Sequence, residues 1–346
     1  MNRVNAQYRE DMAHCRRALA GGSRSFWLAG KLLPAAALDA ATALYAFCRA
    51  ADDLIDGGGD CSASLEQLKH RLDAIYADEP RGFPEDRVLA RLVRLTGLPR
   101  APLDALFEGF SWDLADRRYK TLEELESYGV RVAGSVGLMM AWVLGERRAD
   151  PLARALDLGI AMQLSNICRD VGEDARLSRV YLPRRSLERH GVDAEAFLQA
   201  PQATEGVRKV VAELLERADE LYRRAEQGIR CLPWRVQISI RAAARLYREI
   251  GRVVAENDCD SVSQRAVVPR RRQLKLLLSS VAAPALDLAA LSAPPVRAAE
   301  SLFVRMPARN GTEDQTRPSQ GFVHVLSMLV TLDERRDTDA PDSRQG

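Results

Sequence analysis

Histidine is scarce in this sequence and cysteine is scattered, so neither a zinc site nor a disulfide framework is expected. Only four histidines occur in 346 residues, and none stands at zinc-ligand spacing from a cysteine. No Cys-x-x-Cys pair occurs, so we expect free thiols in a reducing cytoplasm instead of a zinc site or a disulfide framework. The six cysteines are Cys15, Cys48, Cys61, Cys168, Cys231 and Cys259.

Long apolar runs are also missing. No stretch reaches the ~18 uninterrupted apolar residues that a membrane-spanning helix needs. Residues 1–17 contain no apolar core of a secretory signal. We therefore expect a cytoplasmic protein that is soluble or at most bound to a membrane surface.

Neither sign of charge dominates, and the common nucleotide motifs are absent. The 50 Lys and Arg against 48 Asp and Glu leave a net charge of +2. Basic residues do not form one stripe interleaved with aromatics, so a nucleic-acid partner is not expected. The phosphate-binding loop G-x-x-x-x-G-K-[ST] and the dinucleotide fingerprint are missing. The lack of a Glu-x-x-His pair counts against a ferritin-like di-iron bundle.

Alternating β-branched residues, which mark strands, are not found, and every long segment has the helical period. We therefore predict an all-α fold, with about ten or more helices around a central cavity. A change in composition separates a helical domain, residues 1–292, from a polar tail, residues 293–346, expected to be mostly disordered. The predicted helices are 7–20, 36–56, 62–78, 86–96, 101–115, 121–145, one opened by Pro151, 203–228, 234–256 and 274–291.

The most informative stretch is residues 163–183, QLSNICRDVGEDARLSRVYLP. Four of its polar side chains fall within roughly 80° of one another on an ideal helix. They are Gln163, Asn166, Asp170 and Asp174. Apolar residues stand between them: Leu164, Ile167 and Val171. This pattern indicates a carboxylate-lined stripe that faces a cavity.

A second stretch, ALYAFCRAADDLID at residues 43–56, repeats this geometry. Its four polar residues project within roughly 60° of one another. They are Tyr45, Arg49, Asp52 and Asp56. Two helices that each carry an Asp-x-x-x-Asp pair would repel each other unless a cation lay between them. Mg²⁺ fits, because it takes oxygen ligands from carboxylates and from a substrate's phosphates.

Each of three further features has two possible interpretations. Arg24, between Ser23 and Ser25, either belongs to a helix cap or contacts a phosphate. The small residues of 121–145 serve either tight helix packing or the wall of an apolar tunnel. The basic run at 263–275 is either a solvated face or an attraction to anionic lipid. An isolated Tyr247 is more often a core residue than a catalytic one.

Four motifs in this order resemble the squalene and phytoene synthase family, most closely its bacterial phytoene synthases. They are SRSF, YAFCRAADDLID, YGVRVAGSVGLM and QLSNICRDVGEDARLSRVYLP, and the similarity covers roughly residues 10–285. The resemblance implies a single-domain all-α isoprenoid synthase fold. It also implies an Mg²⁺-dependent prenyltransferase of the 15-cis-phytoene synthase type, which joins two geranylgeranyl diphosphates head to head.

In such a reaction the first diphosphate ionises, and the allylic cation is captured by the 2,3 double bond of the second substrate. The resulting cyclopropylcarbinyl diphosphate then ionises, rearranges and loses a proton to give phytoene, the first committed step of carotenoid biosynthesis. Diphosphate leaves only when its charge is neutralised, which Mg²⁺ and arginine provide. An apolar tunnel keeps water from the carbocations.

The resemblance assigns roles to particular residues. Those matching Mg²⁺-diphosphate ligands are Asp52, Asp56, Asp170 and Asp174. Those matching groups that hold diphosphate or support the metals are Arg49, Arg169, Gln163 and Asn166. Substrate-site positions are Ser23, Arg24, Phe26, Tyr45, Tyr128 and Tyr247, and the prenyl chains would border Val132, Ala133, Val136 and Gly137. Members of the family often have Lys at the position of Arg24 and Glu at the position of Asp53.

Alternatives remain within and outside this chemistry. A C15 relative would use farnesyl diphosphate to make dehydrosqualene or squalene, and an inactive helical scaffold would keep the fold alone. We expect Mg²⁺, or Mn²⁺ in its place, and no NADPH. Expected partners are two geranylgeranyl diphosphates, the inner face of the cell membrane and other carotenoid enzymes.

Overall fold

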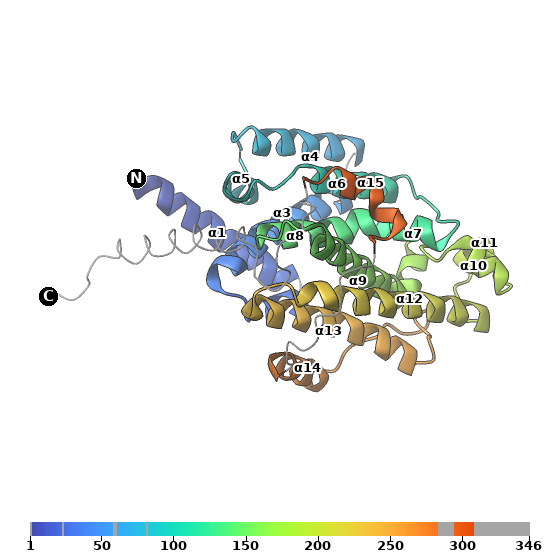
Figure 1. Cartoon of the computed structure of the whole chain (residues 1–346). Helices are drawn as coiled ribbons and strands as arrows, with labels where there is room; N and C mark the ends of the chain where they lie inside the picture. The colour runs from blue at the N-terminus through green and yellow to red at the C-terminus, as the bar shows by residue number, and fades with distance from the viewer. Residues whose placement is uncertain (1, 23, 58–60, 81, 283–293, 308–346) are drawn as a thin grey trace.

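The computed structural model describes residues 2–22, 24–57, 61–80, 82–282 and 294–307, and every regular element in this part is helical (Figure 1). The first half comprises α1 (Asn2–Gly22), α2 (Arg24–Gly30), α3 (Ala35–Asp56), α4 (Cys61–Tyr76), α5 (Pro84–Thr96) and α6 (Ala101–Leu114). It continues with α7 (Leu122–Gly129), the π turn η1 (Val130–Gly134) and α8 (Ser135–Val143). The all-α prediction is confirmed for the described residues.

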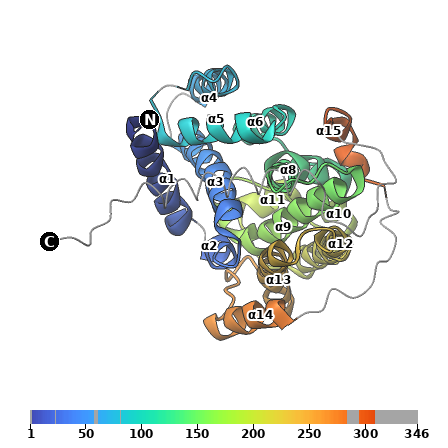
Figure 2. The same cartoon turned by 60° about the vertical axis from the view of Figure 1, so that its left-hand side comes forward.

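The second half is built around α9 (Ala149–Arg176), which packs on α8, η1, α12 and α13 in the middle of the bundle (Figures 1 and 2). The remaining elements are α10 (Arg184–Arg189), α11 (Ala194–Gln199), α12 (Glu205–Ile229), α13 (Trp234–Glu256), α14 (Arg270–Ala282), η2 (Arg297–Ala299) and α15 (Glu300–Val304). Because α9 carries the polar stripe at 163–174, this arrangement places the stripe inside the molecule.

Local chemistry explains where several helices begin and end. The Thr121 hydroxyl caps α7 by accepting a hydrogen bond from the Glu124 backbone N–H at 3.2 Å. α3 ends at Asp56 and Gly57 follows it. Pro151 lies in the first turn of α9, where its missing N–H costs nothing.

The stretch predicted as one helix at 121–145 is divided by η1. The Ser135 N–H bonds to the Val130 carbonyl, five residues back, which is the spacing of a π turn. This turn brings the backbone of Ala133 against α9, where a Cβ on Gly159 would lie 2.3 Å from the Ala133 carbonyl oxygen. The 3.6-residue period of the sequence does not reveal a single wider turn.

Two predictions at the C-terminal end also need correction. α14 begins at Arg270, four residues before the predicted start, directly after Pro269. Part of the predicted tail, residues 294–307, packs on the domain instead of being disordered, because Ala299 and Leu302 bury apolar surface there. Residues 283–293 and 308–346 lie outside the described part. The boundary predicted at residue 292 between the helical domain and the tail therefore stays a prediction.

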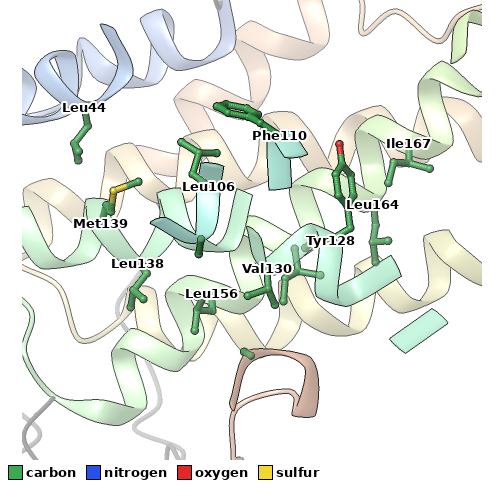
Figure 3. Packing of buried hydrophobic residues seen from close by; sticks show 14 of the residues in the cluster. Leu44, Leu106, Phe110, Tyr128, Val130, Leu138, Met139, Leu156, Leu164 and Ile167 are labelled. Atoms are coloured by element: carbon green, nitrogen blue, oxygen red, sulfur yellow. The ribbon is translucent and has the colours of Figure 1, made fainter. Parts of the chain in front are cut away.

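One large core joins the helices around the site. Leu106 and Phe110 of α6 and Leu156 and Leu164 of α9 are all at most 6% exposed and belong to one contiguous cluster (Figure 3). Leu44 of α3 joins this cluster. The backbones that carry the two polar stripes are therefore held by packed side chains on both sides.

Candidate active site

A cavity of about 450 Å³ lies among α2, α3, α6, η1, α8, α9, α12 and α13. Most of its wall is apolar, with contributions from Leu44, Phe110, Met140 and Leu158. Many residues singled out from the sequence line it together: Phe26, Tyr45, Arg49, Asp52, Val132, Ala133, Val136, Gly137, Gln163, Asn166 and Tyr247. The prediction that both polar stripes face a central cavity therefore holds for part of each stripe.

The small residues of η1 and α8 serve both purposes that the sequence left open. A Cβ on Gly137 would lie 2.4 Å from the Ala155 carbonyl oxygen, so glycine permits close packing of α8 on α9. The same glycine and its neighbour Val136 also line the cavity. Close packing of these backbones thus leaves an apolar surface for a ligand.

An aromatic group closes the α2 side of the cavity. The ring of Phe26 lies 5.3 Å from that of Tyr247 and 6.2 Å from that of Tyr45. Tyr247 packs against the hydrophobic core, as its sequence context favours, and also lines the cavity. Ser23 and the side chain of Arg24, at the start of α2, lie outside what the structure describes.

On α3, the acidic stripe is only partly balanced by the protein. Arg49 pairs with Asp53 at 2.5 Å and with Asp52 at 3.4 Å. Burial and the nearby charge of Asp56 raise the pKa of Asp52. Asp56 itself is exposed and does not line the main cavity. Asp53, to which the sequence pattern gave no role, therefore competes with Asp52 for Arg49.

On α9, the side-chain amide oxygen of Asn166 lacks a hydrogen-bond donor. Its Oδ1 is buried and accepts no hydrogen bond, although Asn166 lines the cavity beside Gln163. A buried acceptor without a partner costs roughly 1–3 kcal/mol. This oxygen is therefore suited to a ligand, water or cation in the cavity.

Asp170, one turn further along α9, is neutralised by two arginines. Arg169 donates to both carboxylate oxygens, at 2.8 and 2.5 Å, and Arg265 Nε donates to Oδ1 at 2.7 Å. Burial acts to raise the pKa of Asp170, but these hydrogen bonds outweigh it and lower the pKa. Arg265 also pairs with Glu173 at 3.2 Å.

Asp174 has the opposite setting. Burial and the negative charge of Asp170 raise its pKa to about 7. Arg179 opposes this rise, and the two residues line a small void together with Tyr181. Asp174 is thus a carboxyl group that the protein leaves short of positive charge.

Tyr128 belongs to a hydrogen-bonded group that the sequence did not reveal. Its hydroxyl donates to Asp113 Oδ2 at 2.9 Å, and the Tyr181 hydroxyl donates to Oδ1 at 3.0 Å. The two tyrosine rings stack with centroids 5.3 Å apart. Both hydroxyls are engaged with a carboxylate, and neither Tyr128 nor Asp113 lines the cavity.

Arg179 connects the two acidic regions. Its charge opposes the rise in pKa of Asp52, Asp113 and Asp174, which come from α3, α6 and α9. Burial is the largest influence on each of these three carboxyl groups and raises its pKa. The positive charge of Arg179 therefore acts on carboxyl groups of both stripes.

The donor set fits Mg²⁺. All the relevant atoms are oxygens, from Asp52, Asp56, Asp170, Asp174 and the amide of Asn166, and the carboxyl groups of Asp52 and Asp174 lack sufficient positive charge. Among the described residues, no three histidine, cysteine or acidic side chains gather as a ready metal site.

Four functional residues escaped the sequence analysis for different reasons. Arg179 lies within the 163–183 stretch but follows the helix, so helical spacing did not include it. Arg265 lies in a basic run that reads as a solvated face. Asp113 is one of three acids on α6, and Tyr181 lies in the 163–183 stretch but after its helix, so helical spacing singled out neither.

Comparison with known proteins agrees with this geometry. The model of the squalene/phytoene synthase family matches residues 19–273. A phytoene synthase from Rhodobacter capsulatus is 46% identical over 273 residues, covering 78% of this chain and 80% of the relative. One from Cereibacter sphaeroides is 39% identical over 340 residues, with 94% and 95% covered, so that alignment includes part of the segment after residue 292.

Solved structures show the same fold. A dehydrosqualene synthase in complex with a ligand superimposes with a TM-score of 0.75 and 33% identity, covering 80% of this chain and 97% of the other. A squalene synthase from Alicyclobacillus acidocaldarius gives 0.68 and 26%, with 73% and 96% covered. The fold, the paired acidic stripes and these matches agree, and the chain belongs to the squalene/phytoene synthase family.

Proposed function

We propose that this protein joins two geranylgeranyl diphosphates head to head to form 15-cis-phytoene, the first committed step of carotenoid biosynthesis. The observation that carries the proposal is the apolar cavity with Arg49, Asp52 and Asn166 in its wall. Four relatives named phytoene synthase or 15-cis-phytoene synthase support it, with identities of 36–46% over at least 75% of this chain.

The reaction requires the protein to bind the leaving diphosphate and to exclude water from the carbocation. In the first half-reaction the C1–O bond of one substrate breaks, and its diphosphate takes the electron pair. The cation adds to the double bond of the second substrate, and a proton leaves as the cyclopropane ring closes. Arg49 lines the cavity, and it would bind diphosphate oxygens together with Arg169 and Arg265 beside Asp170, while the apolar wall would exclude water.

In the second half-reaction the cyclopropylcarbinyl diphosphate loses its own diphosphate, rearranges and gives up a proton. Negative charge again develops at a leaving group, so the same cationic groups are needed. Phe26, Tyr45 and Tyr247, from α2, α3 and α13, lie together in the cavity wall, where their aromatic rings would stabilise a passing cation.

We propose Mg²⁺ as the cofactor, with Mn²⁺ able to replace it and no need for NADPH. Asp52, Asp56, Asp170 and Asp174 would hold the ions, with Asn166 Oδ1 as an additional donor. When bound, Mg²⁺ supplies neutralisation of the diphosphate charge. The raised pKa of Asp174 and the unmet acceptor on Asn166 support this assignment.

The C15 reaction is the second candidate, because a solved relative of 33% identity is named a dehydrosqualene synthase. Purified protein would be incubated with Mg²⁺ and either geranylgeranyl or farnesyl diphosphate, without NADPH, and the hydrocarbon identified by mass. We expect a C40 product from the former. A C30 product from farnesyl diphosphate alone would make the protein a dehydrosqualene synthase, and no product from either would favour an inactive scaffold.

We further propose peripheral contact with the inner face of the cell membrane, because the substrate chains and the product are lipids. None of the described helices is long and apolar enough to cross a bilayer. Contact with other carotenoid enzymes would follow from the low solubility of the product in water. Cosedimentation with vesicles tests the membrane contact, and no binding would contradict it.

A further inference from the structure

Helix α14 carries an apolar stripe that is exposed to solvent. Leu274, Leu278 and Val281 are 58, 64 and 57% exposed, although large aliphatic side chains usually bury. On an ideal helix they lie within roughly 60° of one another. α14 occupies the outer side of α13, at the edge of the bundle (Figure 2). The stripe is thus a continuous surface instead of a set of isolated side chains.

This stripe is separate from the face by which α14 is attached. Leu277 packs on the buried alanines Ala29, Ala242 and Ala243, and Ser280 is fully buried. The Arg245 guanidinium donates to the Ser279 hydroxyl at 3.1 Å. Packing on α13 therefore accounts for one side of α14 and leaves the stripe without an intramolecular partner among the described residues.

Uncompensated positive charge borders the stripe on both sides. Residues 261–282 contain five basic and no acidic residues, although the whole chain has a net charge of only +2. Two of the five are engaged, Arg265 with Asp170 and Arg272 with Glu249 and Glu256. On the helical projection, Arg270 borders one side of the stripe, and Arg271 and Lys275 border the other. All three are exposed.

We propose that this surface, comprising Leu274, Leu278 and Val281 with Arg270, Arg271 and Lys275, docks the protein on an anionic lipid bilayer. An apolar stripe flanked by cations is the pattern of a helix that lies in the membrane interface. A second copy of the chain is a poor partner, because a two-fold interface would bring these like charges together. The proposal rests on the proposed function in that a lipid substrate gives docking its purpose.

The position of α14 links the bilayer to the cavity. Leu277 packs against Ala29 and Ala243, and both alanines line the cavity. Helix α14 with its Leu277, and one layer of small side chains from α2 and α13, therefore lie between the docking surface and the space for the prenyl chains. A protein held in this way would receive substrate and release product next to the lipid phase.

The test is binding of the full-length protein, without substrate, to vesicles of phosphatidylcholine alone or mixed with phosphatidylglycerol. One variant combines Leu274→Ser, Leu278→Ser and Val281→Ser, and a second combines Arg270→Gln, Arg271→Gln and Lys275→Gln. We expect the wild type to prefer the anionic vesicles and each variant to bind them at least about tenfold more weakly. Added salt should weaken wild-type binding, since it screens the lipid charge.

Matched controls separate this surface from general charge and apolarity. Arg94→Gln, Arg184→Gln and Arg223→Gln together remove the same charge from exposed residues elsewhere, and Val304→Ser removes an 83% exposed apolar side chain. Both controls should bind like the wild type. Turnover of detergent-dispersed substrate should be unchanged in every variant, so a failure of the proposed function would appear in that assay alone.

Three outcomes would overturn the proposal. The first is a wild type that ignores anionic vesicles, and the second is a stripe variant that binds like the wild type. The third is vesicle binding that appears only after residues 308–346 are deleted, because that segment, with its own apolar run GFVHVLSMLVTL, would then be the occupant of the stripe.

Discussion

The two acidic stripes have the same spacing but different electrostatic settings. On α9, Asp170 receives hydrogen bonds from Arg169 and Arg265, which lower its pKa. On α3, Asp52 shares Arg49 with Asp53, and burial with the charge of Asp56 raises its pKa. An identical Asp-x-x-x-Asp pattern thus gives one aspartate whose pKa is lowered by its arginine partners and one whose pKa is raised by burial and a neighbouring acid.

This difference suggests how the site is prepared for its substrate. Asp170 and its two arginines form a fixed cluster that can receive a diphosphate or a metal ion without first losing a proton. A bound cation should stabilise the charged forms of Asp52 and Asp174, because burial and neighbouring acids raise the pKa of both carboxyl groups. Binding of metal and diphosphate should therefore be cooperative at these two residues.

The largest effect should come from neutralising either stripe. Asp52→Asn and Asp170→Asn each remove a metal-binding charge without changing volume, so we expect kcat/KM to fall about 10³-fold or more with the fold retained. Steady-state kinetics would measure kcat/KM, and circular dichroism would show whether the fold is retained. Asp73→Asn, which removes an exposed aspartate paired with Arg100 on α4, is the control and should be silent. Near-normal turnover of either site variant would remove the metal assignment.

A smaller loss should follow from weakening the cluster on α9. Arg265→Gln takes one of two cationic partners from Asp170, and a hydrogen bond between charged groups is worth enough for a loss of roughly 10- to 100-fold in kcat/KM. The kcat/KM of Arg265→Lys should lie between that of the wild type and that of Arg265→Gln, because lysine keeps the charge and loses the planar geometry.

The pH profile separates this effect from a general disturbance. In Arg265→Gln the pKa of Asp170 should rise, and the acid limb of the profile should move to higher pH. Arg94→Gln, on α5, provides a control in which an exposed arginine is lost. A profile identical to that of the wild type would mean that Arg265 does not act through Asp170.

Helical spacing predicted the site only as far as local geometry reaches. It placed Tyr45, Arg49 and Asp52 on one cavity-facing side of α3, as the structure confirms. It could not show that Asp56 and Asp170 lie outside the main cavity, because that depends on how α3 and α9 are placed relative to each other. A period along one helix carries no information about the angle between two.

Long-range contacts were the main omission. Arg265 reaches Asp170 across 95 residues, and Tyr181 reaches Asp113 across 68. Neither contact has a sequence pattern, since an arginine or a tyrosine in a loop gains its partner only when the chain folds. The fold class was predictable because every long segment has one period, whereas the π turn at 130–134 was not, because one inserted residue hardly changes that period.

The pH dependence of stability offers a third test of the contrast. The pKa of Asp174 rises from 3.8 to about 7 on folding, so the unfolded chain releases this proton first. The free energy of unfolding should therefore fall as pH rises from about 4 to about 7, by about 2 kcal/mol once solvent screening is allowed for. Denaturation with urea across this range, on wild type and Asp174→Asn, measures it.

Ligands should change that profile in a defined way. Mg²⁺ with inorganic diphosphate favours the charged carboxylate, so the fall should become shallower in the wild type and stay small in Asp174→Asn. If the variant loses stability with pH as steeply as the wild type, another group is responsible.

The smallest effect should come from Asp53, which competes with Asp52 for Arg49. The Arg49 and Asp53 side chains are 45 and 57% exposed, so their pairing at 2.5 Å is weakened by solvent and is worth under about 1 kcal/mol. Asp53→Asn should therefore change kcat/KM less than about threefold. Its direction is informative: release of Arg49 towards Asp52 should lower the pKa of Asp52 and move the acid limb of the pH profile down. A large loss of activity would mean instead that Asp53 itself holds metal or substrate, and that α3 carries three functional acids where α9 carries two.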